Sequence, residues 1–238
     1  MAYLTIGNCV ITIEDCPITI GDPCHAACFI NYLTSGYDGS GDITLTYDVP
    51  ANNGINVSVY LYFYVNGTID SVTSGWISDT TIDNGVDGKL YRYFRDSADN
   101  LTGQTVTVNT TPASGGITAM MIATNMTYND NGVNASGVNV TTLTVSLPSG
   151  SSAAATVDGA FTVLAQPFGH TFGGAYWTVD DANAVLLADQ EAGGGSGVAL
   201  SAWVWADSTT VGIPGTITWN SDSGVSRPEI DYLYFLCV

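Results

Sequence analysis

Four cysteines within the first 28 residues are the strongest candidates for chemistry in this sequence. Cys24 and Cys28 are four residues apart, a spacing that places both on one face of a helix, with His25 beside them. With Cys9 and Cys16 they could form a tetrahedral zinc site of four thiolates, or of three thiolates and His25. The same thiols could instead form disulfides in an oxidising medium, or stay reduced and buried as small apolar side chains. Because the spacing matches no standard zinc knuckle, we rank disulfides first and metal last.

Acidic turns are a second group of candidate ligands. Asp83 and Asp87 lie in one Asn- and Gly-rich turn, and Asp96 and Asp99 lie in the next. Calcium prefers such oxygen ligands, but neither turn matches the 12-residue calcium loop with its terminal glutamate. Asp, Asn and Gly also dominate ordinary turns. We therefore expect no cofactor, with structural calcium at these aspartates or zinc at the cysteines as the alternatives.

Catalytic constellations are weak in this sequence, and we expect that the protein is not an enzyme. His170 lies in a Gly-rich segment, and no Gly-x-Ser-x-Gly motif is present. Glycosidase chemistry needs two carboxylates on either side of a sugar, yet the chain has only three glutamates and one pair of adjacent aspartates, Asp180 and Asp181.

Two rows of aromatic residues suggest a binding surface. Tyr60, Tyr62 and Tyr64 alternate along one expected strand, and Trp203 and Trp205 alternate along another. Such rows could stack on sugar rings, form a subunit interface where Tyr and Trp are enriched, or fill a second buried face of a central strand. We favour burial or an interface over sugar binding.

The charge balance excludes two classes of partner. The chain has 238 residues, with 4 Lys and Arg against 22 Asp and Glu, for a formal net charge of −18. Four cations cannot supply the basic stripe that nucleic-acid binding requires, and an anionic membrane surface is disfavoured for the same reason. No stretch approaches the length of a membrane span, and the first residues lack the features of a secretory signal.

The first 40 residues differ from the rest and are expected to form a Cys-rich N-terminal arm. A unit of apolar residue, Thr, Ile and then Asn or Asp recurs around residues 4–8, 11–15 and 18–22. This pattern predicts three short strands with tight turns. A short helix is expected over residues 24–33 because Asp22 and Pro23 suit the start of a helix, and residues 35–41 are typical of a linker.

From residue 42 onward, short alternating segments separated by turns predict an all-β protein. The expected strands cover residues 43–49, 57–65, 90–95, 104–109, 117–124, 140–147, 160–165, 175–179, 198–206, 216–219 and 230–237. The last of these would hold the fifth cysteine, Cys237, as an unpaired inward residue. A helix near residues 181–187 is a weaker prediction. We expect one antiparallel β-sandwich over residues 41–238, with a split near residues 129–139 as the alternative.

The order of several strand segments resembles the jelly-roll β-sandwich domains of tailed-phage structural proteins, which are themselves similar to carbohydrate-binding modules. The matching segments are residues 41–50, 88–94, 103–109, 215–220 and 231–236. The resemblance covers about residues 41–238 and rests on strand patterns rather than on chemical motifs. It implies a jelly-roll-like fold and a place in a virion, and it carries over no catalytic residue. The Cys-rich arm has no counterpart in those domains.

These observations together predict a structural virion protein on the exposed surface of a bacteriophage particle. The expected role is a capsid decoration protein, a head fibre or a tail component, with the arm docking on the major capsid protein or another virion protein, or forming a homo-oligomer, expected to be a trimer. One alternative is a carbohydrate-binding adhesin that contacts a host-surface glycan. Another is an extracellular surface-layer or filament subunit, which seven Asn-x-Ser/Thr sequons between Asn56 and Asn139 would suit.

Overall fold

The computed structural model of the chain contains only β-strands as regular elements in the residues that it describes. These are residues 3–6, 9–12, 28–86, 88–128, 133–146, 159–166, 177–181, 184–190, 199–206, 216–221 and 227–236. Every strand pair in them is antiparallel. The predicted all-β class with antiparallel sheets is therefore confirmed.

The N-terminal repeat forms a hairpin. Strands β1 (Tyr3–Ile6) and β2 (Cys9–Thr12) pair in a register that places Leu4 opposite Ile11. These two residues hold the same position in successive copies of the repeat, but because the strands are antiparallel the neighbouring positions do not match: Thr5 lies opposite Val10. The third expected strand, around residues 18–20, lies outside the described residues.

The first large sheet contains six strands in the order β3-β8-β5-β7-β6, with β4 also paired to β8. Its strands are β3 (Ile30–Asp38), β4 (Asp42–Tyr47), β5 (Val57–Val72), β6 (Ile77–Asp83), β7 (Lys89–Ser97) and β8 (Gln104–Thr124). Strand β4 pairs with the first part of β8, and β3 pairs with its last part. Consequently β8 joins two segments that the sequence predicted as separate strands.

This first sheet folds over on itself where β5 and β8 bend. Apolar residues of β4 and of the first part of β8 share one core with residues of β5 and of the last part of β8. Backbones approach closely at the bend: a Cβ on Gly67 would lie 2.2 Å from the carbonyl oxygen of Thr111, and one on Gly116 would lie 2.2 Å from that of Asp38. Gly116 also has a φ of 74°, which side-chain-bearing residues rarely adopt.

Two further sheets complete the fold. The second has the order β10-β17-β12-β15-β14, with β9 paired to β17, and the third has the order β11-β16-β13. Their strands are β9 (Thr127–Tyr128), β10 (Val133–Ser136), β11 (Thr142–Ser146), β12 (Gly159–Gln166), β13 (Trp177–Val179), β14 (Val185–Gln190), β15 (Ala199–Ala206), β16 (Thr216–Ser221) and β17 (Glu229–Leu236).

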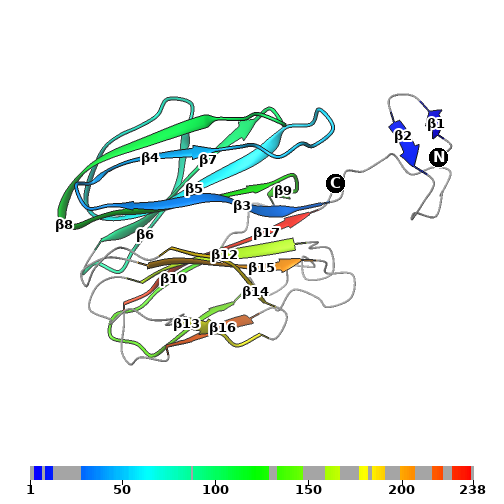
Figure 1. The fold of residues 1–238 in the computed structure, drawn as a ribbon. Helices are drawn as coiled ribbons and strands as arrows, with labels where there is room; N and C mark the ends of the chain where they lie inside the picture. The colour runs from blue at the N-terminus through cyan, green and yellow to red at the C-terminus, as the bar shows by residue number, and fades with distance from the viewer. Residues whose placement is uncertain are drawn as a thin grey trace.

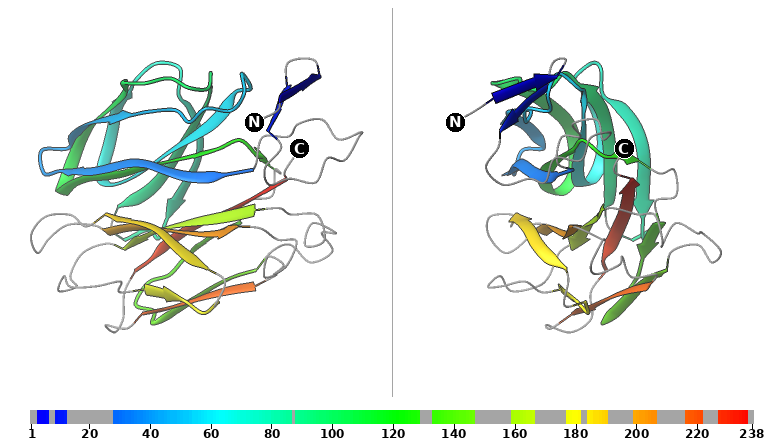
Figure 2. Two further views of the ribbon diagram at one scale, coloured as in Figure 1. Left: turned by 45° about the vertical axis from the view of Figure 1, so that its right-hand side comes forward. Right: turned by 90° about the vertical axis from the view of Figure 1, so that its right-hand side faces the viewer.

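The sheets stack into four layers with three cores between them. In Figure 1, β4 lies in the upper part, β3 and β5 follow below it, then β12, β15 and β17, and finally β13 and β16 at the bottom. The left view of Figure 2 shows the same succession from another side. The first core lies inside the folded sheet, the second between β5 and the β12-β15-β17 layer, and the third between that layer and the β11-β16-β13 sheet. Two of the layers are therefore buried on both faces.

Three local predictions are wrong. The expected helix over residues 24–33 is strand from Ile30 onward, and the expected linker over residues 35–41 lies mostly within β3. Pairing with β8 decides both cases, because sheet hydrogen bonds outweigh weak local propensity. The expected helix at residues 181–187 is replaced, from Val185 onward, by strand β14 on the edge of the second sheet. The sandwich accordingly begins by residue 30, inside the segment assigned to the arm.

Candidate functional site

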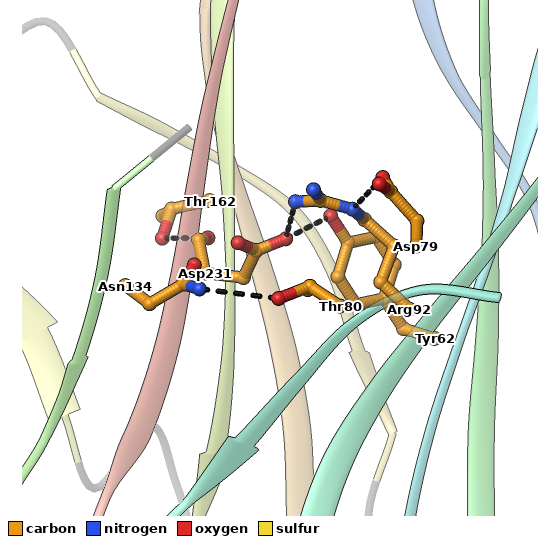
Figure 3. A network of polar contacts seen from close by, with 7 residues as sticks. All are labelled: Tyr62, Asp79, Thr80, Arg92, Asn134, Thr162 and Asp231. Carbon is orange, nitrogen blue, oxygen red and sulfur yellow. Dashed lines mark hydrogen bonds and ion pairs between the residues drawn. The ribbon is translucent and has the colours of Figure 1, made fainter. Parts of the chain in front are cut away.

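The densest group of buried polar side chains lies between the first and second sheets (Figure 3). Arg92 of β7 donates hydrogen bonds from Nη1 to Oδ2 of Asp231 in β17 and from Nε to Oδ2 of Asp79, the latter at 2.7 Å. The Tyr62 hydroxyl donates to the same Asp231 oxygen at 2.6 Å. We call Tyr62, Asp79, Arg92 and Asp231 the Arg92 network.

Strand register explains how these residues meet. Tyr62 of β5 is directly opposite Arg92 of β7, so both side chains leave the first sheet on the same face. On β17, Asp231 alternates in phase with Leu233 and Phe235, which belong to the second core. The network therefore lies at one end of an otherwise apolar layer.

Burial dominates the electrostatics of the network. Asp231 is completely buried and Arg92 is 4% exposed. Complete burial raises the pKa of the Asp231 carboxyl, although Arg92 and the Tyr62 hydrogen bond oppose that rise. Burial alone would lower the pKa of Arg92, but Tyr62, Asp231 and Asp79 outweigh it and raise that pKa above its ordinary value. The guanidinium therefore stays charged at any pH at which the protein is folded.

A second buried carboxylate reinforces the same interface. Glu229 of β17 is completely buried and accepts hydrogen bonds from the backbone N–H groups of Asn84, at 3.0 Å, and Leu90, at 2.6 Å. The Asn84 side chain donates to the backbone carbonyl of Arg227 at 3.1 Å. These bonds attach the turn between β6 and β7 to the start of β17.

The side chains of this site connect the first and second sheets. Arg92 and Tyr62 both donate to Oδ2 of Asp231, whereas the buried Oδ1 of that carboxylate has no hydrogen-bond partner in the described part of the chain. Thr162 supports the arrangement by donating to the Asp231 carbonyl at 2.9 Å. The network orients the two sheets relative to each other, a role for which buried ionic groups are suited because misalignment leaves a charge unpaired.

The tyrosine row and Trp203 lie in the interior. Tyr60, Tyr62 and Tyr64 are each at most 2% exposed, and Trp203 is 5% exposed. Tyr60 contacts Phe161 edge to face, and the Tyr64 hydroxyl accepts the Gly88 N–H at 2.7 Å. These four side chains therefore offer no surface to a glycan or a partner subunit, and the burial alternative is the one that the structure shows.

The placement of Trp205 is known only for its backbone. It lies in β15 opposite Ala160 of β12, and its side chain is outside the described part of the chain.

The acidic turns do not converge. Asp83 accepts from Gly85 N–H at 2.6 Å and pairs with Lys89 at 2.9 Å, at one end of β7. Asp96 accepts from the Ser58 hydroxyl at the other end of that strand. Asp99 accepts the backbone N–H groups of Asn52 and Gly54.

Backbone N–H, hydroxyl and ammonium groups thus contact these carboxylates, and Asp87 lies outside the described residues. Within those residues, no group of three or more His, Cys, Asp or Glu side chains is placed to hold a metal ion.

The structure describes two of the five cysteines, Cys9 and Cys28. Cys28 is disulfide-bonded, and Cys9 lies in β2 opposite Ile6. Cys16, Cys24 and Cys237, together with both histidines, lie outside the described residues.

Sequence reasoning missed the Arg92 network and Glu229. Glu229 was considered only for glycosidase chemistry, and Asp231 only as part of a terminal strand. One feature of the sequence does point to these two acids. Glu229 and Asp231 fall on the same face of the eight-residue strand as Leu233 and Phe235.

No protein-family model, curated protein or solved structure matches the chain. In the described part of the chain, no helix is long and apolar enough to span a membrane.

Proposed function

We propose that this chain is a non-enzymatic structural protein of a bacteriophage particle, such as a capsid decoration protein, a head fibre or a tail component. The observation that carries this proposal is the use of the polar and aromatic groups. The Arg92 network, Glu229 and the tyrosine row all serve contacts between layers of the stack. A chain whose buried polar groups join its layers in this way is suited to a structural role.

The N-terminal hairpin supports a docking role. A two-stranded hairpin is at best marginally stable on its own in water. Strands β1 and β2 pair with each other and, in the described part of the chain, with no third strand. Contact with a capsid protein, or with the hairpins of other copies in a homotrimer, would supply the missing partner surface.

The charge supports exposure on a particle. A net charge of −18 keeps the surface soluble and discourages adhesion to nucleic acid during assembly. The virion assignment also draws on the strand-pattern resemblance to phage structural domains.

Immunogold electron microscopy of particles purified from the source tests the assignment. Gold over icosahedral heads would support a decoration protein, and gold at tails or fibre tips would support a tail component. Particles without gold would overturn the virion proposal.

The docking role needs its own experiment. A variant lacking residues 2–12 should fold, as judged by near-ultraviolet circular dichroism, but should fail to join particles. The matched control is Thr46→Glu, a substitution at an exposed position of β4 that should leave incorporation unchanged. Normal incorporation of the deletion variant would show that the hairpin is not the docking element.

A further inference from the structure

Polar side chains gather at the end of the first core that lies farthest from the bend. The last residue of β7 is directly opposite Val57, the first residue of β5, whereas the bend lies near Gly67. The last residue of β4 lies at the same end, as does the residue that precedes β6. We call this set the Arg95 cluster: Tyr47 of β4, Trp76 before β6, and Arg95 and Ser97 of β7.

Ring contacts and strand phase bring the members of the Arg95 cluster together. The Arg95 guanidinium carbon lies over the Trp76 ring, 5.6 Å from its centroid, which is the arrangement of a cation–π contact. The Tyr47 ring contacts the same indole edge to face, with centroids 6.4 Å apart. Along β7, Ser97 and Arg95 alternate in phase with Tyr93, which packs against the first core. The four side chains therefore lie on the same side of the first sheet.

Three members of the Arg95 cluster are buried polar groups that lack a hydrogen-bond partner in the described part of the chain. They are the Tyr47 hydroxyl, the Trp76 Nε1–H and the Ser97 hydroxyl, and these residues are 3%, 9% and 2% exposed. Buried donors in native proteins are almost always paired, because a donor without an acceptor destabilises the folded state. Three such groups at one end of a single core indicate an acceptor that the described residues do not supply.

Arg95 is a cation that has no carboxylate partner among the described residues. The other two cations of β7, Lys89 and Arg92, each form ion pairs with aspartates. Asp96 follows Arg95 in the chain, but it lies on the opposite face of β7 and accepts from the Ser58 hydroxyl at 3.0 Å. The chain has 22 acidic residues against 4 Lys and Arg, so a half-buried arginine without an acid is a marked exception. Its charge is available to an anion from outside the chain.

The donors of the Arg95 cluster select the chemistry of the ligand. All four groups can donate a hydrogen bond, and the guanidinium and the indole N–H can only donate, so the ligand must accept. A water molecule is uncharged and would leave the guanidinium without a counter-ion. A carboxylate accepts at both of its oxygens and matches the planar fork of arginine. A dianion such as phosphate is disfavoured, because the net charge of −18 repels each further negative charge.

We propose that the Arg95 cluster binds a carboxylate group, supplied by a small organic acid or by an acidic residue of a partner protein. Arg95 is the most exposed member and makes the first contact, and the Trp76 Nε1–H and the two hydroxyls complete the site. Burial raises the pKa of the Tyr47 hydroxyl and the Arg95 charge opposes that rise, so these two groups are close enough to interact. This binding activity goes beyond the structural role proposed above and does not depend on it.

Indole N–H signals in a proton–nitrogen NMR spectrum of the full-length protein measure binding. The chain has 5 tryptophans, and the variant Trp76→Phe assigns the signal of Trp76. Acetate and benzoate are the free-acid probes, a capped tripeptide with a central glutamate is the protein-type probe, and acetamide and benzamide are the neutral controls. We expect a carboxylate to move the Trp76 signal with a millimolar dissociation constant, and the amides to leave it in place. A signal that no carboxylate moves at up to about 0.05 M would overturn the proposal.

The two sources of the carboxylate give different orders of affinity. Tighter binding of the tripeptide than of acetate and benzoate would assign the ligand to a partner protein. The reverse order would assign it to a small organic acid. Both results support the site, and each identifies one source.

A pair of matched variants locates the binding site. Arg95→Gln should weaken carboxylate binding at least about tenfold, because it removes the charge and the fork of donors. Lys89→Gln removes the same charge at the other end of β7, where Lys89 pairs with Asp83, and should leave binding unchanged. Equal loss in the two variants would mean that only overall charge matters, which contradicts the proposal.

Two hydroxyl deletions keep the test decisive if Arg95→Gln fails to fold by near-ultraviolet circular dichroism. Tyr47→Phe and Ser97→Ala each remove a buried hydroxyl that has no partner among the described residues. Each variant should therefore be at least as stable as the wild type without ligand, yet bind a carboxylate about threefold to tenfold more weakly. Unchanged binding in both variants would contradict the proposal.

Discussion

Arg92 and Asp231 are 139 positions apart in the chain, yet they form an ion pair between buried side chains. The first belongs to the folded six-stranded sheet and the second to the layer that packs against it. Their contact, together with the bonds to Tyr62 and Asp79, fixes how the two halves of the stack align.

Removing one partner of this pair should be costly. Asp231→Ala removes the buried carboxylate that pairs with the buried Arg92 guanidinium, so we expect a loss of about 3–5 kcal/mol in the free energy of unfolding. Urea denaturation followed by tryptophan fluorescence measures it. Asp96→Ala, at an exposed aspartate outside the network, should change stability by no more than about 0.5 kcal/mol.

Replacing the pair with apolar residues provides a second measurement. The double variant Arg92→Met, Asp231→Leu removes both charges, so it should be more stable than Asp231→Ala by about 1–4 kcal/mol. If the double variant is the less stable of the two, the cost of the single substitution does not arise from burying the Arg92 guanidinium without Asp231.

Alkaline pH should weaken the fold through Tyr62. Complete burial and the adjacent Asp231 raise the pKa of the Tyr62 hydroxyl well above its ordinary value, so the folded state holds this proton more tightly than the unfolded state. The resulting stability is present below about pH 10 and is lost as the pH rises toward the pKa of the folded state. Tyr62→Phe should therefore lose less stability than the wild type between about pH 9 and about pH 11.5. Tyr32→Phe, at a tyrosine that is 39% exposed, is the matched control and should follow the wild type.

Acidic pH should act on the turn that Asp99 holds. Hydrogen bonds from the N–H groups of Asn52 and Gly54 lower the pKa of the Asp99 carboxyl, so its contribution is present above the ordinary aspartate pKa and is lost as the pH falls through the lowered value. Carboxyl NMR titration should find Asp99 ionised at a pH where an ordinary aspartate is half protonated. A titration midpoint at or above the ordinary aspartate value would contradict the bonds seen in the structure.

The bend in β8 should be intolerant of a side chain. Gly116→Ala meets the Asp38 carbonyl and adopts an unfavourable φ, which together should cost about 2–5 kcal/mol in the free energy of unfolding. Gly75→Ala is the control: φ there is 88° but no atom lies within 4 Å of the new Cβ, so only the conformational cost of about 1–2 kcal/mol is expected. Equal costs at the two glycines would show that the close approach at the bend is relieved elsewhere.

Strands with strict alternation were predictable from the sequence. Along β5, the alternation places two sets of side chains on opposite faces, as the pattern indicates. The first core receives Val57, Val59, Leu61, Phe63 and Val65, and the second receives Tyr60, Tyr62 and Tyr64. Strand β3 was not predictable, because Gly36 and two serine or threonine neighbours are typical of a linker and only pairing with β8 makes the segment a strand. The same holds for β14, whose alanine and leucine residues favour a helix in isolation.

The network was beyond local pattern analysis for a different reason. Glu229 and Asp231 share one face of β17 with Leu233 and Phe235, and this phase does not show what covers that face. They are buried because β17 lies in a layer that is covered on both sides, which depends on the whole stack. Their partners, Arg92 and the N–H groups of Asn84 and Leu90, come from distant parts of the chain.

The position of β17 also sets an order of events during synthesis. This strand is the last one that the structure describes, yet it lies between β10 and β12 in the interior of its sheet and contributes to two of the three cores. Earlier segments can pair as they emerge from the ribosome, but the gap between β10 and β12 stays open until translation has passed residue 236. Until then the apolar faces on both sides of that gap remain uncovered, so the nascent chain has an interval in which chaperones, rather than its own packing, must protect it.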